Sequence, residues 1–420
     1  MAGTRDALRH ASVRRYLVST ALAALGLNVL VTVLYKQVFD ITGDELDIGL
    51  LGLAQFLPAI FLVLVSGWVA DRFDRRRVSG IFLVARVGCA VALAAYSFGD
   101  PSAVWPFFAI AFVFGAVDAM LVPSRRSIAP LVAPVELFPS VVALWTGTFT
   151  AASIVGPVLG GFLYTVGPDL AYLVAAVAQL LAVIPIVTIV YAREQERSTE
   201  RATLGAALEG LRFVRRTPVV LAVISLDLFA VLFGGAIALI PAVASERLGV
   251  GDIAYGWLRA APGIGAATMA VVLALRPVQR RVGPTLLTVV AVFGAGTVVF
   301  GLTRSYTVAF VALVVISAAD MVSMYIRGSI VPLATPDDQL GRVNAVEGVF
   351  IGASNELGAF ESGVAARALG LSWAIAAGGF VTMGVAAVFA VLFPSLRRID
   401  SFDEVRPPKD PATPVSRASG

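Results

Sequence analysis

The chain has 420 residues, of which 58% are hydrophobic and 14% are charged, and its formal net charge is +4. Soluble domains carry charge on about a quarter of their residues, so this much apolar surface cannot be buried in one water-soluble core. Cys89 and His10 are the only cysteine and histidine, which excludes a disulfide framework, a metal centre built on Cys or His, and a histidine proton relay.

Twelve stretches along the chain are long and apolar enough to span a bilayer, which takes about 20 residues. The first apolar run, Tyr16 to Tyr35, is too long for the core of a signal peptide and predicts the first span. Backbone groups in hydrocarbon must bond within their own segment, which favours helices. The predicted helices cover residues 15–37, 48–70, 78–98, 103–124, 138–165, 170–191, 217–243, 254–275, 284–303, 306–328, 342–365 and 371–394. The sequence therefore predicts an all-α membrane protein of twelve transmembrane helices.

Arginine is concentrated at both termini and in every second loop between the predicted helices, whereas the alternate loops carry mainly acidic residues such as Asp44, Asp100 and Asp169. Positively charged loops remain in the cytoplasm. Both termini are therefore expected in the cytoplasm, and the chain in a bacterial inner membrane. The alternation also accounts for the basic net charge without a nucleic-acid partner.

An internal repeat predicts two related halves. Seven residues recur at an offset of 202, and the same offset aligns Gly156 with Gly358 and Gly161 with Gly363. The repeated residues are Asp118, Arg125, Ser127, Ile128, Pro130, Leu131 and Pro134, which match Asp320, Arg327, Ser329, Ile330, Pro332, Leu333 and Pro336. Chance identity is the alternative, but a gapless pattern of charged, polar and proline residues favours duplication. Transporters with such parallel repeats hold their substrate between the halves.

We expect six-helix halves at 15–191 and 217–396. They are joined by a cytoplasmic linker, 192–216, in which apolar residues recur at helical spacing and predict an amphipathic helix on the membrane surface. A short cytoplasmic tail, 1–14, precedes the first half. A proline-rich segment, 397–420, is expected to be a disordered cytoplasmic tail.

A glycine, an acid and several arginines close the second predicted helix: Gly67, Asp71, Arg72, Arg75 and Arg76. Asp71 is placed to cap a facing helix, where the helix dipole is positive. The arginines are placed to bond carboxylates or carbonyls across the interface between the halves. The segment is thus a candidate latch for one closed state. A plain positive-inside loop would explain the arginines but not the Gly-x-x-x-Asp-Arg spacing.

Small residues also mark the fifth predicted helix, which carries Gly147, Gly156, Pro157, Gly160 and Gly161. Glycines one turn apart form a smooth face for close helix packing, and Pro157 removes a backbone bond and permits a bend. Generic small-residue packing is the alternative interpretation.

These two segments resemble motifs A and C of the major facilitator superfamily. Asp74 stands where motif A has a glycine, and Ala152 where motif C has one more glycine. Gly341-Arg342-Val343-Asn344, at the start of the eleventh predicted helix, resembles the branch of bacterial enterobactin (siderophore) exporters and macrolide efflux proteins. The resemblance extends from about Arg14 to Arg398 and implies the major facilitator fold. It also implies proton-coupled antiport by alternating access and, through motif C, export. The motif B arginine of the fourth helix is absent, so its proton-relay role is not carried over.

Charged side chains within the predicted spans are functional candidates, because each costs about 2.5–3.5 kcal/mol in hydrocarbon. They are Arg86, Asp118, Asp227, Arg259, Asp320, Glu347, Glu356 and Glu361. Asp227 and Glu356 lie deepest and are candidates for proton coupling, with a buried structural acid as the alternative. The repeat suggests structural roles for Asp118 and Asp320, and Glu347 and Arg259 are expected near helix ends, exposed to water.

Uncharged polar side chains also occur within the spans. Asn28, Gln55 and Gln179 are expected to line the cavity or, as the favoured interpretation, to form hydrogen bonds between helices.

Two of the charged candidates are expected to pair. At ~1.5 Å per residue, Arg86 lies ~12 Å and Asp118 ~10 Å from the same end of neighbouring helices. An ion pair at a shared depth is the least costly arrangement for both charges. The alternative places Arg86 among the lipid headgroups and Asp118 in an aqueous cavity.

The function most consistent with these features is proton-driven export of small amphiphilic molecules, drug-like or siderophore-like. No Gly-x-Ser-x-Gly elbow or nucleotide-binding Gly-x4-Gly-Lys-Ser/Thr loop occurs in the sequence, which argues against an enzyme and an ATP-driven pump. An importer of the same fold and a non-transporting scaffold or sensor remain as alternatives. We expect no cofactor, a monomer, and a small molecule, protons and the lipid bilayer as partners.

Overall fold

A computed structural model describes residues 2–192 and 204–406 of the chain. Within these ranges the ordered elements are helices and helical turns. The first half contains α1 (Ala2–Arg9), α2 (Ala11–Thr42), α3 (Glu45–Arg72), α4 (Arg75–Ser97), α5 (Trp105–Arg126), α6 (Phe138–Tyr164) and α7 (Pro168–Val187), with 3-10 turns at Ala129–Leu131 and Val135–Leu137. The second half contains α8 (Leu204–Arg216), α9 (Pro218–Gly234), α10 (Ile240–Ala242), α11 (Asp252–Leu275), α12 (Val282–Leu302), α13 (Tyr306–Leu333), α14 (Asp337–Leu369), α15 (Leu371–Leu392) and α16 (Pro394–Arg397).

Eleven segments of the described chain are long and apolar enough to cross a membrane. The eleventh predicted helix corresponds to α14, which has 33 residues but is too polar to qualify by hydropathy. This helix packs against α3 of the first half and α8, α9 and α15 of the second, so protein surrounds much of its polar surface. With α14 included, the structure confirms the all-α fold and is consistent with twelve spans.

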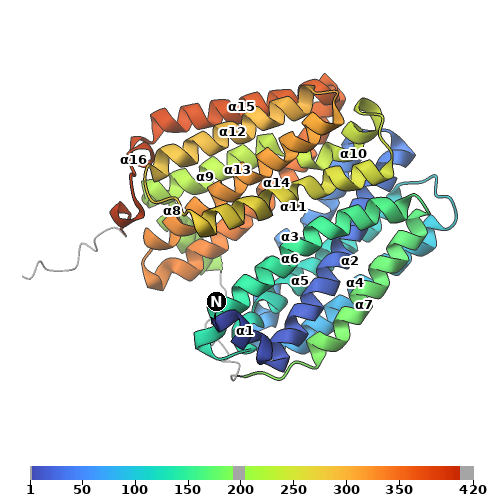
Figure 1. Cartoon of the computed structure of the whole chain (residues 1–420), viewed down its shortest axis with the longest axis horizontal. Coiled ribbons are helices and arrows are strands. Elements are labelled where there is room, and N and C mark those ends of the chain that lie inside the picture. The colour runs from blue at the N-terminus through green and yellow to red at the C-terminus, as the bar shows by residue number, and fades with distance from the viewer. Residues whose placement is uncertain (1, 193–203, 407–420) are drawn as a thin grey trace, which may run out of the picture.

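The helices form two bundles, one from α2–α7 and the other from α9–α15 (Figure 1). The bundles meet through two helix pairs, α3 with α14 and α6 with α11. At one end lie α1, α8, α16 and the arginine-bearing loops, and we call this the arginine-rich end. The other end, which carries the turns at Gly43 and Gly249, is called the opposite end.

The sequence repeat has a physical counterpart in helix packing. A Cβ atom on Gly156 of α6 would lie 2.5 Å from Asn28 Cβ on α2, and one on Gly358 of α14 would lie 2.9 Å from the Leu232 carbonyl oxygen on α9. These glycines therefore let α2 and α9, the first long apolar helix of each half, approach α6 and α14 closely.

The second pair of repeated glycines has the matching role between the halves. A Cβ on Gly161 would lie 2.8 Å from Gly256 Cα on α11, and one on Gly363 would lie 3.2 Å from Gly49 Cα on α3. Each half thus uses an equivalent glycine to contact the other half, as expected for a duplicated unit.

The predicted helix 217–243 is not continuous. It ends as α9 at Gly234 and resumes as a 3-10 turn, Ala236–Leu239, before α10. Two successive glycines weaken the helix there, and a Cβ on Gly235 would lie 3.2 Å from the Gly358 carbonyl carbon. The backbone of α14 therefore lies where a side chain at residue 235 would project.

The expectation of disorder from residue 397 is wrong for residues 397–406. Ile399 and Val405 are buried, and the Gly283 amide donates to the Ile399 carbonyl at 3.0 Å. The Arg281 amide donates to Asp400 Oδ1 at 3.1 Å. These bonds satisfy amides at the start of α12 that have no partner within the helix. Residues 407–420, the rest of the expected tail, and linker residues 193–203 lie outside the described residues.

Candidate functional site

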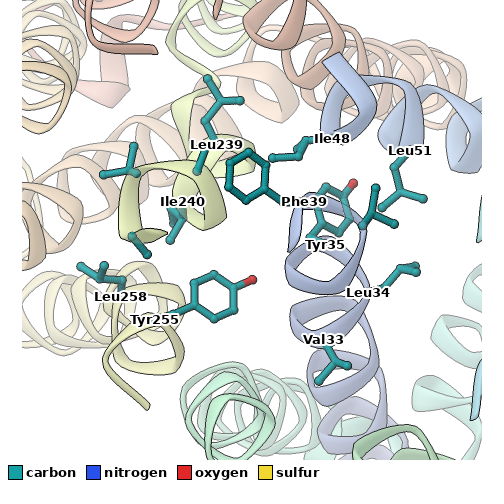
Figure 2. Close-up of a cluster of buried hydrophobic side chains, with 14 of the residues drawn as sticks. Val33, Leu34, Tyr35, Phe39, Ile48, Leu51, Leu239, Ile240, Tyr255 and Leu258 are labelled. Carbon is teal, nitrogen blue, oxygen red and sulfur yellow. The ribbon is translucent and has the colours of Figure 1, made fainter. Parts of the chain in front are cut away.

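An apolar cluster joins the two halves at the opposite end (Figure 2). In Figure 2, Tyr255 points toward α2, and Phe39 lies beside Leu239 and Ile240 of the second half. These side chains are buried. The labelled members are Val33, Leu34, Tyr35 and Phe39 from α2, Ile48 and Leu51 from α3, and Leu239, Ile240, Tyr255 and Leu258 from the second half. Burial of these side chains favours contact between the halves at this end.

Polar bonds cross the same interface. Tyr255 Oη donates to the Thr32 carbonyl at 2.8 Å. Lys36 Nζ lies 2.5 Å from Asp40 Oδ2 in its own helix and 3.4 Å from Asp252 Oδ1 of α11. Since Lys36 is buried, these ion pairs are shielded more than exposed ones would be.

A further ion pair joins the halves at this end. Arg367 Nη1 lies 3.1 Å from Asp44 Oδ2. Arg367 is substantially exposed, so we expect this pair to contribute little to the stability of the closed end.

The halves separate toward the arginine-rich end. A Cβ atom on Gly341 or Gly348 of α14, or on Gly147 of α6, would meet nothing within 4 Å. At the opposite end of the same helices, one on Gly363 would lie 2.7 Å from the Glu45 carbonyl oxygen. The molecule is therefore closed at the opposite end and opens toward the arginine-rich end.

A cavity of about 710 Å³ lies between α3 and α5 of the first half and α14 of the second. This volume is in the range of sites for small molecules. Aromatic and aliphatic side chains such as Phe56, Ile60 and Phe114 form much of the wall. The polar residues of the lining are Gln55, Asp118, Asn344, Asn355 and Glu356. We call this space the central cavity.

The central cavity brings together two carboxylates from different halves, Asp118 on α5 and Glu356 on α14. Glu356 Oε2 approaches α3 so closely that a Cβ on Gly52 would lie 3.0 Å from it and 3.4 Å from Tyr35 Oη. Gln55 Nε2 lies 3.5 Å from the same Tyr35 oxygen. Glu356 thus lies where the open cavity meets the closed interface.

The ion pair predicted between Arg86 and Asp118 is confirmed. Arg86 Nη1 donates to Asp118 Oδ1 at 2.9 Å. Its Nε donates to Gln179 Oε1 at 2.8 Å, and its Nη2 to the Ala23 carbonyl at 3.2 Å. The favoured interpretation of Gln179, a hydrogen bond between helices, is confirmed as well. Arg86 is buried and fully engaged, so the pair holds α2, α4, α5 and α7 together.

A second, smaller cavity of about 190 Å³ lies between α2, α5 and α6 on the other side of this ion pair. Arg86 lines this second cavity, while its partner Asp118 lines the central cavity. Arg125 and Arg126 of α5 and Trp145 and Phe149 of α6 also line it. Sequence reasoning missed this space; the repeat of Arg125 as Arg327 was the available signal.

Asp227, expected to be either a coupling carboxylate or a buried structural acid, is an ion-pair partner of Arg327. Glu347 Oε1 lies 3.0 Å from Arg327 Nε. The expectation that Glu347 is simply exposed to water near a helix end is therefore wrong. The three side chains come from α9, α13 and α14 and form one buried charged cluster in the second half.

The other charged candidates lie outside both cavities. Arg259 of α11 stacks over the Tyr35 ring, 5.6 Å from its centroid, and its Nη1 lies 3.4 Å from the Ile237 carbonyl oxygen. Asp320 lies half-buried on α13 and lines neither cavity. The charges singled out by hydropathy therefore differ widely in their surroundings.

Asn28 is held by its own helix: its Nδ2 donates to the Ala24 carbonyl at 2.8 Å. Its Cβ lies against Gly156. In the same seam, a Cβ on Gly160 would lie 3.3 Å from Thr32 Cβ, and one on Gly256 would lie 2.7 Å from the Pro157 carbonyl oxygen. The glycine-rich part of α6 therefore packs α2 and α11 together at the opposite end, whereas Gly147 lies apart from this contact.

The loop between α3 and α4 is held within the first half. Asp74 caps α4 by accepting from the Arg76 amide at 2.9 Å, and it pairs with the Arg76 guanidinium at 2.7 Å. The hydrogen bonds from Arg76 hold the Asp74 carboxyl at a pKa of about 2, below its ordinary value. Tyr191 Oη donates to Asp74 Oδ1 at 3.2 Å, and the Arg76 guanidinium stacks on the Tyr191 ring.

The loop arginines make their described backbone bonds inside the same half, although bonds across the interface were expected. Arg75 Nη1 donates to the Ser127 carbonyl at 2.8 Å, and Arg76 Nη1 to the Ile189 carbonyl at 2.7 Å. The separation of the halves at this end accounts for the difference. Gly67 and Asp71 lie in the last turns of α3, and the Asp71 side chain is outside the described residues.

Comparison with known proteins places these features in context. The family model of the Major Facilitator Superfamily matches residues 16–346. The multidrug efflux pump Tap of Mycolicibacterium fortuitum is 27% identical over 398 residues, covering 90% of this chain and 94% of that protein. The enterobactin exporter EntS of Escherichia coli is 25% identical over 411 residues, covering 94% of each chain.

Solved structures share the fold. A POT family transporter crystallised with 5-aminolevulinic acid superposes with a TM-score of 0.72 at 11% identity, covering 91% of this chain and 96% of that one. A D-xylose–proton symporter superposes with a TM-score of 0.67 at 14% identity, covering 90% and 96%. At these identities the likeness concerns the fold alone.

Proposed function

The chain belongs to the major facilitator superfamily and is a membrane transporter, not an enzyme, and we propose that it exports small amphiphilic molecules in exchange for protons. The full-length relatives Tap and EntS are named as exporters, which supports the outward direction. The amphiphilic substrate, the proton as counter-ion and a monomeric state are parts of this proposal.

The orientation proposed is that of a bacterial inner-membrane protein with both termini in the cytoplasm. The arginine-rich end gathers Arg75 at the start of α4, the exposed Arg126 at the end of α5 and Arg281 at the start of α12, as the positive-inside rule requires of the cytoplasmic side. In this orientation the central cavity is open to the cytoplasm. An exporter collects its substrate in that state.

The observation that carries the proposal is the central cavity itself, which joins one carboxylate from each half below a closed interface. Alternating access would close the arginine-rich end and open the opposite end. The halves proposed to move are 15–191 and 217–396, joined by the linker 192–216. Within the linker, α8 stays with α14, because the two helices pack closely: a Cβ on Gly210 would lie 2.7 Å from the Arg342 carbonyl oxygen.

Glu356 is the carboxylate best placed for proton coupling. It lines the central cavity and lies against Gly52 of the other half, so its protonation state would affect contact between the halves. Asp118 is a second candidate, with Arg86 as its competing cation. Asp227 is less suited, since Arg327 already pairs with it. Asp320 and Asn28 line neither cavity and take structural roles in this proposal.

The candidate latch consists of Gly67, Asp71, Arg72, Arg75 and Arg76. It would act in the state that is closed at the arginine-rich end. There the arginine-rich ends of the halves meet, and the latch would bond across them. The glycines and Pro157 of α6 would let α2 and α11 shift against one another at the opposite end, because close backbone contacts permit sliding without side-chain clashes.

Proton-coupled uptake is the second candidate, because a D-xylose–proton symporter has the same fold and the fold alone does not set the direction of transport. Everted membrane vesicles energised with a proton gradient separate the two directions. We expect the vesicles to accumulate a fluorescent amphiphile, with loss of accumulation when the gradient is collapsed. Accumulation by intact cells but not by everted vesicles would contradict export.

A further inference from the structure

We propose that the second cavity, between α2, α5 and α6, binds the acidic group of an anionic amphiphile, with Arg125 as the cation that receives it. This inference rests on the proposed transport function and names the substrate class for it. It concerns the cavity of about 190 Å³ lined by Arg86, Arg125 and Arg126.

Arg125 has hydrogen-bonding capacity to spare. Its Nη2 lies 3.4 Å from Thr20 Oγ1. Its Nη1 is shielded from solvent and has no hydrogen-bond partner among the described residues. A guanidinium carries five N–H donors in a fork that matches a carboxylate. A guanidinium nitrogen that is shielded from water and has no hydrogen-bond partner is costly, so an incoming anion would gain both charge pairing and hydrogen bonds.

The lining of the second cavity is one-sided in charge. Three arginines and no carboxylate line it within the described part of the chain. Arg86 is occupied, because it pairs with Asp118 and donates to Gln179 and to the Ala23 carbonyl. Arg126 is exposed. Arg125 is therefore the shielded cation that remains without a carboxylate.

The repeat explains why Arg125 lacks a partner. Its counterpart in the second half, Arg327, is neutralised by Asp227 and Glu347. At the same offset of 202 the first half has Leu25 and Trp145 in place of those acids. The neighbouring residues of α2, 21–25, are alanines and leucines. The duplicated arginine has thus kept its position in the first half, while both of its carboxylates are missing.

The remaining wall fits an apolar group next to the acid. Trp145 and Phe149 of α6 line the cavity together with Leu27 and Leu121. Aromatic walls favour flat apolar groups through burial and ring contacts. The chemistry that matches this site is a single carboxylate or similar monoanion attached to an aromatic group.

Calorimetry on the purified full chain in detergent micelles tests the site without any gradient. The probes are 1-naphthoate and the uncharged 1-naphthylmethanol, which differ in charge but share the ring. We expect the wild type to bind naphthoate about tenfold or more tightly than the alcohol, as charged hydrogen bonds predict. Arg125→Gln should remove that preference. Arg9→Gln, at an exposed arginine of α1, should leave it intact.

A second pair of variants keeps Arg125 and guards against a folding defect. Trp145→Glu places an acid where the second half has Glu347, and it should abolish naphthoate binding by supplying an internal partner. Trp145→Phe changes the wall but adds no acid, so its affinity for both probes should change while the preference for naphthoate over the alcohol remains. Equal affinity for the two probes in the wild type, or unchanged naphthoate binding in both Arg125→Gln and Trp145→Glu, would overturn the inference.

The binding test of the anion site and the transport test of the proposed function can fail independently of one another. Arg125-dependent binding without gradient-driven movement in vesicles would contradict the transport proposal and leave the anion site standing. Export of uncharged amphiphiles, with no Arg125-dependent binding of naphthoate, would support transport and overturn the site.

Discussion

Arg86 and Asp118 form an ion pair whose members face different cavities: Asp118 lines the space between the halves, and Arg86 lines the smaller space within the first half. The pair therefore lies between two cavities, the central cavity lined by two carboxylates and the second cavity lined by three arginines. Any change in the charge of Asp118 would alter the interactions available to Arg86 on the other side.

The first prediction concerns this pair. Arg86→Ala should lower the free energy of unfolding by about 3 kcal/mol, because it leaves a carboxylate without its partner, and Asp118→Ala should have a similar effect. The double variant should recover part of the loss. Thermal melts in detergent would measure all three variants. If the double variant lost as much free energy of unfolding as the two single variants together, the two residues would act independently.

The second prediction separates Glu356 from Asp227. Glu356→Gln should abolish proton-driven efflux in everted vesicles but permit exchange of substrate across the membrane, because a titratable group is lost while the shape is kept. Asp227→Asn should instead reduce the yield of folded protein, since Arg327 keeps Glu347 alone as partner. Full proton-dependent efflux in Glu356→Gln would remove Glu356 as the coupling group.

The third prediction concerns the closed end. Asp252→Asn removes the carboxylate that faces Lys36 across the interface and should shift the population toward the state open at that end. A cysteine introduced as Ile48→Cys, in the Figure 2 cluster, should then react faster with a maleimide. Phe98→Cys, at a position 82% exposed, is the matched control and should react at an unchanged rate. Equal Ile48→Cys labelling with and without Asp252→Asn would argue against a closing role for this contact.

The fourth prediction uses the depressed pKa of Asp74, about 2 against an ordinary 3.8. A carboxyl with a lowered folded-state pKa stabilises the protein above its unfolded pKa, and this stabilisation is lost as pH falls through the folded pKa. Asp74→Asn should therefore cost about 1 kcal/mol at neutral pH after allowance for solvent screening. The difference from wild type should shrink below about pH 4. A difference that stays constant from pH 7 to pH 3 would contradict the assignment.

The fifth prediction concerns topology. A reporter fused after Ser401 should be active in the cytoplasm, because this residue lies at the arginine-rich end. Reporters inserted near Asp44 and Asp169, in turns at the opposite end, should report the periplasm. A cytoplasmic signal near Asp44 would contradict the proposed orientation.

Quantities that depend on position along a helix could be read from the sequence. Hydropathy and length located the helices, and the offset between repeats related the two halves. The Arg86–Asp118 pair was predictable because depth follows from the rise per residue, and consecutive helices are usually neighbours. None of these inferences required knowledge of which direction a helix face points.

Only the tertiary structure decided which side chains meet around the helix axes. The depth of Asp227 was compatible with a coupling carboxylate or a buried structural acid, and only the convergence of α9, α13 and α14 pairs it with Arg327 and brings Glu347 to the same cation. The break after Gly234, the folded segment at 397–406 and the end at which the molecule is closed also arise from contacts between segments far apart in the chain. Hydropathy locates a helix in the bilayer, and the position of a residue along that helix then gives its depth. The rotation of each helix about its axis is set by packing against its neighbours.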